Sequence, residues 1–576
     1  MKKSYVVLAA LILLAAALLA LAACNRADDP PAPPPAVQTP TPAPAPGQPT
    51  PDPTPEGPVI PAFMNEIGTL PIVNQPVTLS VFTGAGAGID YTTNLGALEF
   101  EYRTGVSIDW IQVPAADIAT RRNLMLATGD LPDIFAQNQG MSAAAIFHYA
   151  SLGIFRPITP WIDPFAPELQ RAFEIHPNIH DGMYMPDGHI YGFPAIDDCF
   201  HCSMNLKLWI YTPWLENLGL EIPRTPEELY NVLVAFRDND PTGEGREIIP
   251  MAGAFRGWDH GINTLVNAWI TMNQNRMIVD NGQIRVIYDT EEYREALRFV
   301  NRLFEEGLFA EDSLVLDRAG LRILADGGPD GANQVGVMPA MWVAGVSSHW
   351  NQGQWRVIPY LIGPGGHQVA VYNPLQANHR AVITNRVSDE LMPVAVRWLD
   401  NFLTDESALL QVQGIEDLNW RRSDPGEVGI HGGPAMWERI PTPAGETPIP
   451  NTTMGQILPN FRSHEFRLSE RANRSIIEQE TLLYDESMLM LPFRDRIENI
   501  VPVLMFDEAV SAELVDIQTA LETFVVESEA RFVAGELCLD RDWDFYLREL
   551  NIIGLPRFLE IMQTAFNERE ARLAGR

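Results

Sequence analysis

The spacing of apolar residues predicts alternating strands and helices in the first part of the chain. Apolar and polar residues alternate over residues 77–82 and 106–111, which indicates two strands, and residues 131–135 enter a third. Helices are predicted between these strands, at residues 95–103 and 116–127. This alternation is typical of an α/β sheet.

Helical patterns dominate the later part of the chain. Residues 225–228, Thr-Pro-Glu-Glu, form a capping box in which the Thr hydroxyl accepts the amide of the third helical residue. A helix is predicted from Asp289 to Gly307, with apolar residues on one face. Three more helices are predicted, over residues 514–535, 541–549 and 555–572. Residues 424–464 are rich in Pro, Gly and Thr and predict a long surface loop.

The first 23 residues have the pattern of an export signal. Two lysines follow Met1, residues 5–22 are apolar, and small residues precede Cys24. This ending resembles the lipobox of bacterial lipoprotein precursors, which implies cleavage before Cys24 and a lipid attached to it. The alternative is an uncleaved transmembrane anchor, because the apolar run nearly spans a bilayer.

Residues 24–70 are expected to form a linker between the lipid and the folded body. The tract is rich in Pro, Ala, Thr and Gln, cannot bury a core and favours extended polyproline II structure. We therefore expect an extracytoplasmic body, tethered by its lipid to the outer face of a bacterial cell membrane.

Composition narrows the possible classes of function. The net charge is −34 and the pI is about 4.6, which argues against nucleic acid as a partner, because phosphates need cations. Lysine occurs only at Lys2, Lys3 and Lys207, which argues against a Ser–Lys dyad or a Schiff-base lysine. The length allows more than one hydrophobic core.

The remaining cysteines leave several alternatives open. Cys199 and Cys202 form a Cys-Phe-His-Cys step, which outside the cytoplasm can close a small disulfide loop. The step could instead be half of a zinc site with His201, or a redox pair. A zinc site normally needs a second ligand pair, and the sequence shows none. We favour a local disulfide or two buried thiols, and we expect Cys538 in the core.

Four strings in order carry a family resemblance. They are NLMLATGDLPDI at 123–134, DGHIYGFP at 187–194, WLENLGL and TPEEL within 214–229, and LFEEGL at 303–308. Together they resemble the extracellular solute-binding proteins of family 1, the receptors of carbohydrate ABC importers. The C-terminal run from Leu514 to Leu555 resembles the long lipoprotein branch of that family, and the resemblance covers the chain after residue 75.

The resemblance implies an α/β, two-lobed fold of the periplasmic-binding-protein type (type II), with an interlobe cleft and a helical C-terminal region. Lobe 1 is expected to comprise residues 72–192 and 367–413, and lobe 2 residues 196–365 and 414–576. Crossings between the lobes are expected near residues 191–195, 363–366 and 413–414. Ligands of open α/β sheets lie at the carboxyl ends of the strands, which would face the cleft.

A sugar in such a cleft needs aromatic faces and side chains that hydrogen-bond in the plane of its ring. The expected stacking residues are Trp269, Trp342 and Trp420, and their alternative role is that of core or edge tryptophans. The expected hydrogen-bonding residues are Thr83, Gln137 and Asn138, after the first-lobe strands. Their alternative role is that of ordinary loop residues.

Residues 238–247 lie where related receptors carry an EF-hand-like calcium loop. Asp240, Thr242, Glu244 and the Arg246 carbonyl match its first, third, fifth and seventh positions, and Glu247 partly compensates for a missing acidic pair. Bound Ca²⁺ is therefore one expectation, and a solvated acidic turn is the alternative.

The resemblance implies a binding component without catalysis and without a required cofactor. It would capture a sugar or oligosaccharide and deliver it, as a monomer, to the transmembrane subunits of an ABC permease. One alternative is a surface lipoprotein glycoside hydrolase, which needs paired carboxylates. Another is a sensor receptor for a membrane kinase. The sequence contains no HExxH helix and no GxSxG elbow.

Overall fold

The computed structural model describes residues 60–574, except 87, 137–140, 256, 274, 329–330, 349–352, 443–446, 448, 457, 475–477 and 507. Cys24, the signal segment and most of the linker lie outside the described residues, as do Gln137 and Asn138. Within the described part of the chain, no helix has both the length and the apolarity needed to cross a membrane.

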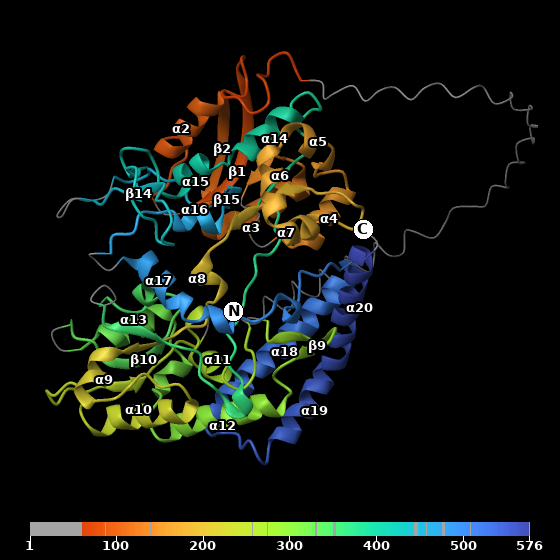
Figure 1. Cartoon of the computed structure of the whole chain (residues 1–576). Coiled ribbons are helices and arrows are strands. Elements are labelled where there is room, and N and C mark those ends of the chain that lie inside the picture. The colour runs from red at the N-terminus through yellow and green to blue at the C-terminus, as the bar shows by residue number, and fades with distance from the viewer. Residues whose placement is uncertain are drawn as a thin grey trace, which may run out of the picture. The chain divides into compact units, whose positions relative to one another are not determined.

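The first sheet has the strand order β2-β1-β3-β12-β4; its strands β1 and β2 are labelled in Figure 1. β1 (Val77–Ala85) pairs in parallel with β2 (Val106–Pro114) and β3 (Ile134–Ala136). β12 (Ala381–Ile383) runs antiparallel to β3 and to β4 (Gly192–Phe193). The three strands expected from alternation are confirmed, and the core around this sheet defines lobe 1.

Eight helices of the described chain pack with this sheet. α2 (Leu95–Thr104) begins where Asn94 accepts the amide of Ala97, and it ends at Gly105, whose φ of 70° suits a left-handed cap. The other seven are α3 (Ile118–Thr128), α4 (Ala143–Ser151), α5 (Thr159–Phe165), α6 (Pro167–Ile175), α7 (Pro177–Met183), α14 (Met392–Asn401) and α15 (Asp405–Val412). α2 and α3 confirm the two helices expected between the strands.

The second sheet has the order β11-β6-β10-β7 and defines lobe 2. β10 (Val335–Pro339) runs parallel to β7 (Ile249–Met251) and antiparallel to β6 (Leu208–Tyr211). β11 (Trp355–Ile358) pairs with the other edge of β6. A separate hairpin joins β8 (Met277–Asp280) to β9 (Gln283–Val286).

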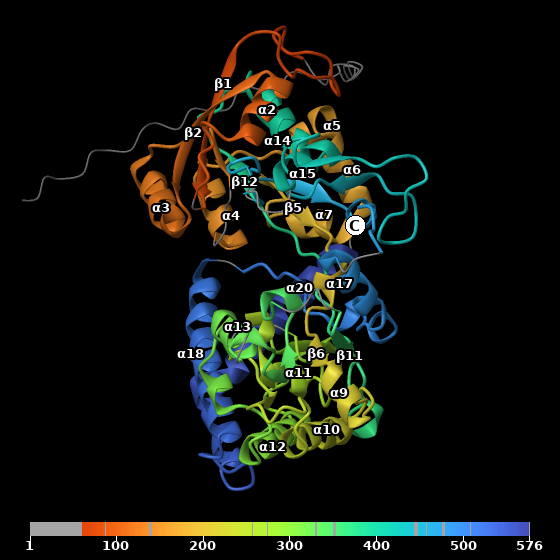
Figure 2. The same ribbon diagram turned by 90° about the vertical axis from the view of Figure 1, so that its left-hand side faces the viewer.

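Helices of lobe 2 follow the predicted caps. Thr225 accepts the amide of Glu228 at the start of α10 (Pro226–Asp238), and the Glu228 carboxylate accepts the amide of Arg224. The helices are α9 (Thr212–Leu218), α10, α11 (Gly261–Val266), α12 (Glu291–Glu305), α13 (Arg318–Asp326), α17 (Gln479–Met488), α18 (Glu508–Val533), α19 (Trp543–Ile553) and α20 (Leu555–Ala574). Figure 2 shows the long α18 beside the helices of lobe 2.

Residues 420–466 pack against lobe 1, which corrects two expectations. Trp420 at the start of β13 (Trp420–Arg422) and Trp437 in β14 (Trp437–Arg439) are buried against Leu409 of α15. Met454, Leu458 and Phe461 lie in the lobe 1 core. The assignment of residues 414–576 to lobe 2 is therefore wrong for this segment, and so is the expected surface loop at 424–464. The apolar residues of this segment are scattered among Pro and Gly without a helical or strand period. Their burial depends on contacts with distant parts of the chain, which the sequence pattern does not show.

The chain passes between the two cores at three places. The first crossing lies between Ile196 and Met204, the second between Val371 and Leu375, and the third between Phe466 and Leu482. β5 (Ala195–Asp197) pairs in parallel with β15 (Asn460–Arg462), and the short helices α8 (Phe200–Ser203) and α16 (His464–Leu468) follow these two strands.

Two expected crossings are wrong because their glycines have other roles. A Cβ at Gly363 would lie 1.6 Å from the carbonyl oxygen of Ala268, so this glycine permits close packing inside lobe 2. Gly414 has a φ of 101° and forms the turn that leads toward Trp420 within lobe 1. The first crossing begins a few residues after the expected 191–195.

Candidate functional site

A cavity of about 650 Å³ lies where the crossings meet, and we call it the hinge pocket. Lobe 1 contributes His176 and lobe 2 contributes Arg494, while residues from 197–205 and 372–375 of the crossings complete the wall. This volume is within the range of small-ligand sites, about 300–1,000 Å³. A second cavity of about 570 Å³ lies within lobe 2, beside α18, and has no wall from lobe 1.

Polar groups of the hinge pocket are free to bind a ligand. The carboxylate of Asp198 accepts no hydrogen bond from the described residues, and the basic nitrogen beside it is His176 Nε2, 3.8 Å away. His176 Nε2 is buried and has no hydrogen-bond partner in the described chain. Burial lowers the pKa of His176, against the attraction of Asp198. A carboxylate acceptor beside a neutral imidazole matches a sugar hydroxyl, which both donates and accepts.

Aromatic faces lie beside these polar groups. Phe200 and Tyr372 line the hinge pocket. The guanidinium carbon of Arg494 is 4.7 Å from the centre of the Tyr372 ring, and the His464 ring is 5.0 Å from the Phe200 ring. Flat apolar faces next to hydrogen-bonding groups are the combination that binds sugar rings.

The crossings are tied to each other at the pocket. Asn373 Nδ2 donates to Asn205 Oδ1 over 2.6 Å, and the Asn373 amide donates to the carbonyl of Ser203 over 2.7 Å. These bonds join the first crossing to the second. They therefore hold the two crossings together beside the pocket.

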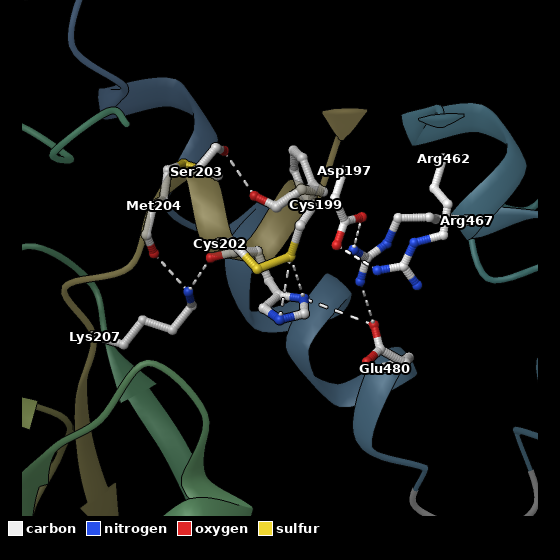
Figure 3. The surroundings of a disulfide bond; sticks show 11 residues. Asp197, Cys199, Cys202, Ser203, Met204, Lys207, Arg462, Arg467 and Glu480 are labelled. Atoms are coloured by element: carbon white, nitrogen blue, oxygen red, sulfur yellow. Dashed lines mark hydrogen bonds and ion pairs between the residues drawn. A yellow bond between two sulfur atoms is a disulfide. The ribbon is translucent and has the colours of Figure 1, made fainter. Parts of the chain in front are cut away.

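A network of ion pairs joins the first crossing to the third (Figure 3). Asp197 at the end of β5 accepts from Arg462 and, over 2.5 Å, from Nη1 of Arg467. Arg467 Nη2 also lies 3.6 Å from the Glu480 carboxylate of α17. Removing one member would leave a half-buried charge without its partner, which is costly.

A disulfide and a buried lysine hold helix α8, as Figure 3 shows. Cys199 and Cys202 are bonded to each other, so the local disulfide is the form present. Lys207 Nζ donates to the carbonyls of His201 and Met204, over 2.7 and 2.5 Å. Burial lowers the pKa of Lys207 to about 7. Burial, with Lys207 and Arg467 nearby, lowers the pKa of His201 well below its usual range.

The expected core position of Cys538 is wrong, because its side chain is exposed. The residue follows α18, in the turn before α19, where its amide donates to the Asp542 carboxylate.

None of the expected binding residues that the structure describes lines the hinge pocket. Trp420 is buried, and its Nε1 donates to the Gly414 carbonyl, so it is a core tryptophan of lobe 1. Trp269 packs at the edge of the lobe 2 core, with its ring 5.1 Å from that of Phe299. In both cases the alternative role is the one observed.

Trp342 and Thr83 also have structural partners. The guanidinium carbon of Arg318 lies 4.1 Å from the centre of the Trp342 ring and occupies one of its faces. Arg318 in turn pairs with the buried carboxylate of Asp259. Thr83 lies inside β1, not in a loop after it, and has no exposed surface. A sugar contact at Trp342 stays a prediction for its other face.

The sequence reasoning missed the residues that line the hinge pocket. A local signal existed only for Asp198, which closely follows the DGHIYGFP string at the first crossing. His176, Tyr372, His464 and Arg494 stand in stretches without any binding motif. Only the fold brings these five residues to one cavity.

The candidate calcium loop does not gather its acidic side chains around one point. Asp240 accepts hydrogen bonds from the amides of Thr242 and Gly245, which lower its pKa. The Glu244 carboxylate pairs with Arg246 Nε at 2.5 Å. Among the described residues, the carboxylates of this loop, including Glu247, do not gather into a cluster of three. Calcium wants six to eight oxygens, so this donor set fits the solvated turn better.

Calcium is therefore expected to leave the thermal midpoint of unfolding unchanged, within about 1 °C. A loop with one uncommitted carboxylate binds calcium too weakly for the binding free energy to stabilise the folded state by mass action. Thermal unfolding with millimolar calcium, compared with a chelator-treated sample, checks this. A midpoint that rises with calcium and falls in an Asp240→Asn variant would show that the loop does bind the ion.

Two α/β lobes joined by three crossings, with a ligand-sized cavity at the hinge, define a two-lobed solute-binding fold. The model of the bacterial extracellular solute-binding protein family matches residues 87–319. Over these residues the chain is similar to this family, whose members are non-enzymatic binding components.

Relatives extend the likeness over most of the chain. It is 26% identical over 492 residues to FusA, a fructooligosaccharide ABC transporter substrate-binding protein of Streptococcus pneumoniae, covering 82% of this chain and 86% of FusA. The structure of FusA with kestose superposes with a TM-score of 0.69 at 23% identity, covering 86% of this chain and all of that one. The structure of an HMO-binding solute-binding protein of Bifidobacterium longum infantis superposes with a TM-score of 0.71 at 18% identity, covering 86% of this chain and 99% of that one. Lipoprotein LipO of Bacillus subtilis is 27% identical over 238 residues, covering 40% and 44%.

Proposed function

We propose that this protein is the membrane-anchored, extracytoplasmic substrate-binding component of a carbohydrate ABC importer, and that it captures an oligosaccharide in the hinge pocket. The observation that carries this proposal is the hinge pocket itself, which has walls from both lobes, aromatic faces, and uncommitted polar groups. FusA and the HMO-binding protein, both of this fold, are named for oligosaccharide binding, which supports the same class of ligand here.

The mechanism is closure of the two lobes around the ligand. A ligand shifts the balance between open and closed states only by binding one of them better. In the hinge pocket, Asp198 and His176 bind from one side and Arg494 from the other, so all three engage one ligand only when the lobes approach. The closed form then docks on the permease subunits and releases its ligand there.

The lipid on Cys24 and the linker at 24–70 keep the receptor beside the membrane. The relation to LipO, named as a lipoprotein, supports this arrangement. A tether raises the effective concentration of the receptor at the permease without any new contact. The body would act as a monomer, one copy per transported ligand.

The Asp198→Asn substitution is expected to weaken oligosaccharide binding about 10- to 100-fold. A hydrogen bond to a charged acceptor contributes about 1.5–3 kcal/mol, which corresponds to this range. Calorimetric titration with kestose and fructo-nystose, the ligands named for the FusA structures, measures it. Asp424→Asn, an exposed aspartate outside the hinge pocket, is the matched control and should bind like the parent protein.

If these sugars do not bind, a wider panel of neutral and acidic oligosaccharides follows, screened by thermal shift. Absence of binding by any saccharide would end the proposal. Equal sugar affinities of Asp198→Asn and Asp424→Asn would leave the proposed function standing, but they would show that the sugar binds outside the hinge pocket. Transport of the bound sugar, in cells with and without the neighbouring permease, separates import from a sensor role.

A further inference from the structure

The disulfide loop contains three of the four ligands of a closed metal site. Sulfur atoms of Cys199 and Cys202 and a ring nitrogen of His201 all lie within 4.8 Å of one another. It is the only such group of metal-binding side chains in the described chain. Cys199 and His201 are buried, so water would not compete for their positions.

A carboxylate from a distant part of the sequence stands beside this group, next to His201 but outside the set of three that lie within 4.8 Å of one another. Glu480 of α17 places Oε2 3.7 Å from Nδ1 of His201. Helix α17 packs on α8, and this contact brings residues about 280 positions apart to the same point. The sequence spacing of Cys199, His201 and Cys202 could not reveal this carboxylate.

The distances suit a tetrahedral ion. Zinc binds sulfur at about 2.3 Å and imidazole nitrogen at about 2.0–2.1 Å, so two such ligands on one ion stand about 3.5–3.6 Å apart. Cys199 Sγ lies 3.5 Å from His201 Nε2 and 3.7 Å from its Nδ1. The two sulfurs must separate once their bond is broken, and α8 is short enough to allow this.

The surroundings supply a balancing charge. Two thiolates and one carboxylate around Zn²⁺ carry a net charge of −1. Arg467 lies 3.6 Å from Glu480, and the amine of Lys207 binds the carbonyl of His201. A cation beside an anionic complex lowers the cost of burying it.

We propose that the reduced protein holds one Zn²⁺ between Cys199, Cys202, His201 and Glu480. A dithiol reductant breaks the Cys199–Cys202 bond and becomes a disulfide itself, passing two electrons and two protons to the two sulfurs. Zn²⁺ then binds the thiolates and displaces both protons to solvent. In the oxidised protein the site is closed, because each sulfur is bonded to the other.

The metal would connect α8, at the first crossing, to the start of α17, at the third. Cys199 and Cys202 also line the hinge pocket. Phe200 of α8 packs on the same lobe 2 cluster as Leu482 and Leu483 of α17, so zinc would cross-link two segments that already lie together beside the hinge pocket. The redox state of the disulfide and the presence of the metal would therefore affect ligand binding. This effect does not depend on which sugar binds.

Cobalt titration of the reduced full-length protein tests the proposal. Cys24→Ser and Cys538→Ser remove the other two cysteines of the chain. The protein is reduced with dithiothreitol, freed of it without air and titrated with Co²⁺, whose thiolate and tetrahedral d–d absorption bands report the ligands. One equivalent is expected to bind, Zn²⁺ to displace it, and the oxidised protein to bind none.

Substitution of Glu480 tests whether its carboxylate binds the metal. Glu480→Gln is expected to weaken Co²⁺ binding at least tenfold, since even the loss of an outer-shell partner costs 10- to 100-fold. Glu478→Gln, two positions away and bonded to the Asn473 amide, is the matched control and should change nothing. Thermal unfolding of both oxidised variants verifies their fold.

Three results would overturn the proposal. They are no cobalt uptake by the reduced protein, equal uptake after Cys199→Ser with Cys202→Ser, and equal effects of Glu480→Gln and Glu478→Gln. None of these outcomes bears on sugar capture, which is measured with the oxidised protein.

Discussion

The free energy of unfolding of this protein is expected to rise by about 3–4 kcal/mol between pH 7 and pH 10, and a Lys207→Met variant to lose that rise. The pKa of Lys207 is about 7 in the folded protein, against 10.5 as its ordinary value. Between these values the unfolded chain binds a proton that the folded protein does not. Stability therefore increases with pH through this window, and it is lowest below pH 7, where the buried amine must be charged.

Urea unfolding at four pH values between 7 and 10 measures the effect. Other groups that titrate in this range, such as tyrosines, act on both proteins, so the difference between the parent and Lys207→Met isolates the amine. The variant also leaves the carbonyls of His201 and Met204 without their donor. This loss lowers stability by the same amount at every pH, so it does not contribute to the difference in slope between the two proteins. Parallel pH profiles of the two proteins would mean that Lys207 is not buried as described.

Trp420→Ala is expected to lower the free energy of unfolding by about 3–5 kcal/mol, the usual cost of emptying a buried aromatic site. Trp420 is 3% exposed, packs on Leu409 and Trp437, and donates to a backbone carbonyl. Trp342→Ala is expected to cost about 1–2 kcal/mol, because its ring is half-buried and lies under Arg318.

Denaturant unfolding of both alanine variants measures these two losses in the free energy of unfolding. The dependence of that free energy on denaturant concentration should stay the same as in the parent protein. A Trp420→Phe variant keeps an aromatic ring but not the Nε1 donor, and it should fall between the parent and Trp420→Ala. Equal losses at Trp342 and Trp420 would contradict the distinction between a lobe 1 core residue and a half-buried side chain. A large loss of sugar affinity in folded Trp420→Ala would restore the stacking role.

The regular elements could be predicted because their signals are local. Alternation located β1 and β2, and the capping box at Thr225 located the start of α10, since these patterns act within a few residues. The two expected crossings at glycine-rich strings were wrong for the opposite reason. A glycine in the sequence indicates either close packing or a positive φ. Only the tertiary structure shows that Gly363 permits close packing and that Gly414 has a positive φ.

By itself the sequence indicated an α/β solute-binding fold and its local caps, because periodicity and short motifs reflect interactions between near neighbours. It could not determine which side chains meet. Asp198, Tyr372 and Arg494 form one pocket, and Glu480 reaches His201, only after the crossings bring distant segments together. Burial is equally non-local, so the tertiary structure alone decided that Trp420 belongs to a core and that Lys207 is an amine with a pKa near 7.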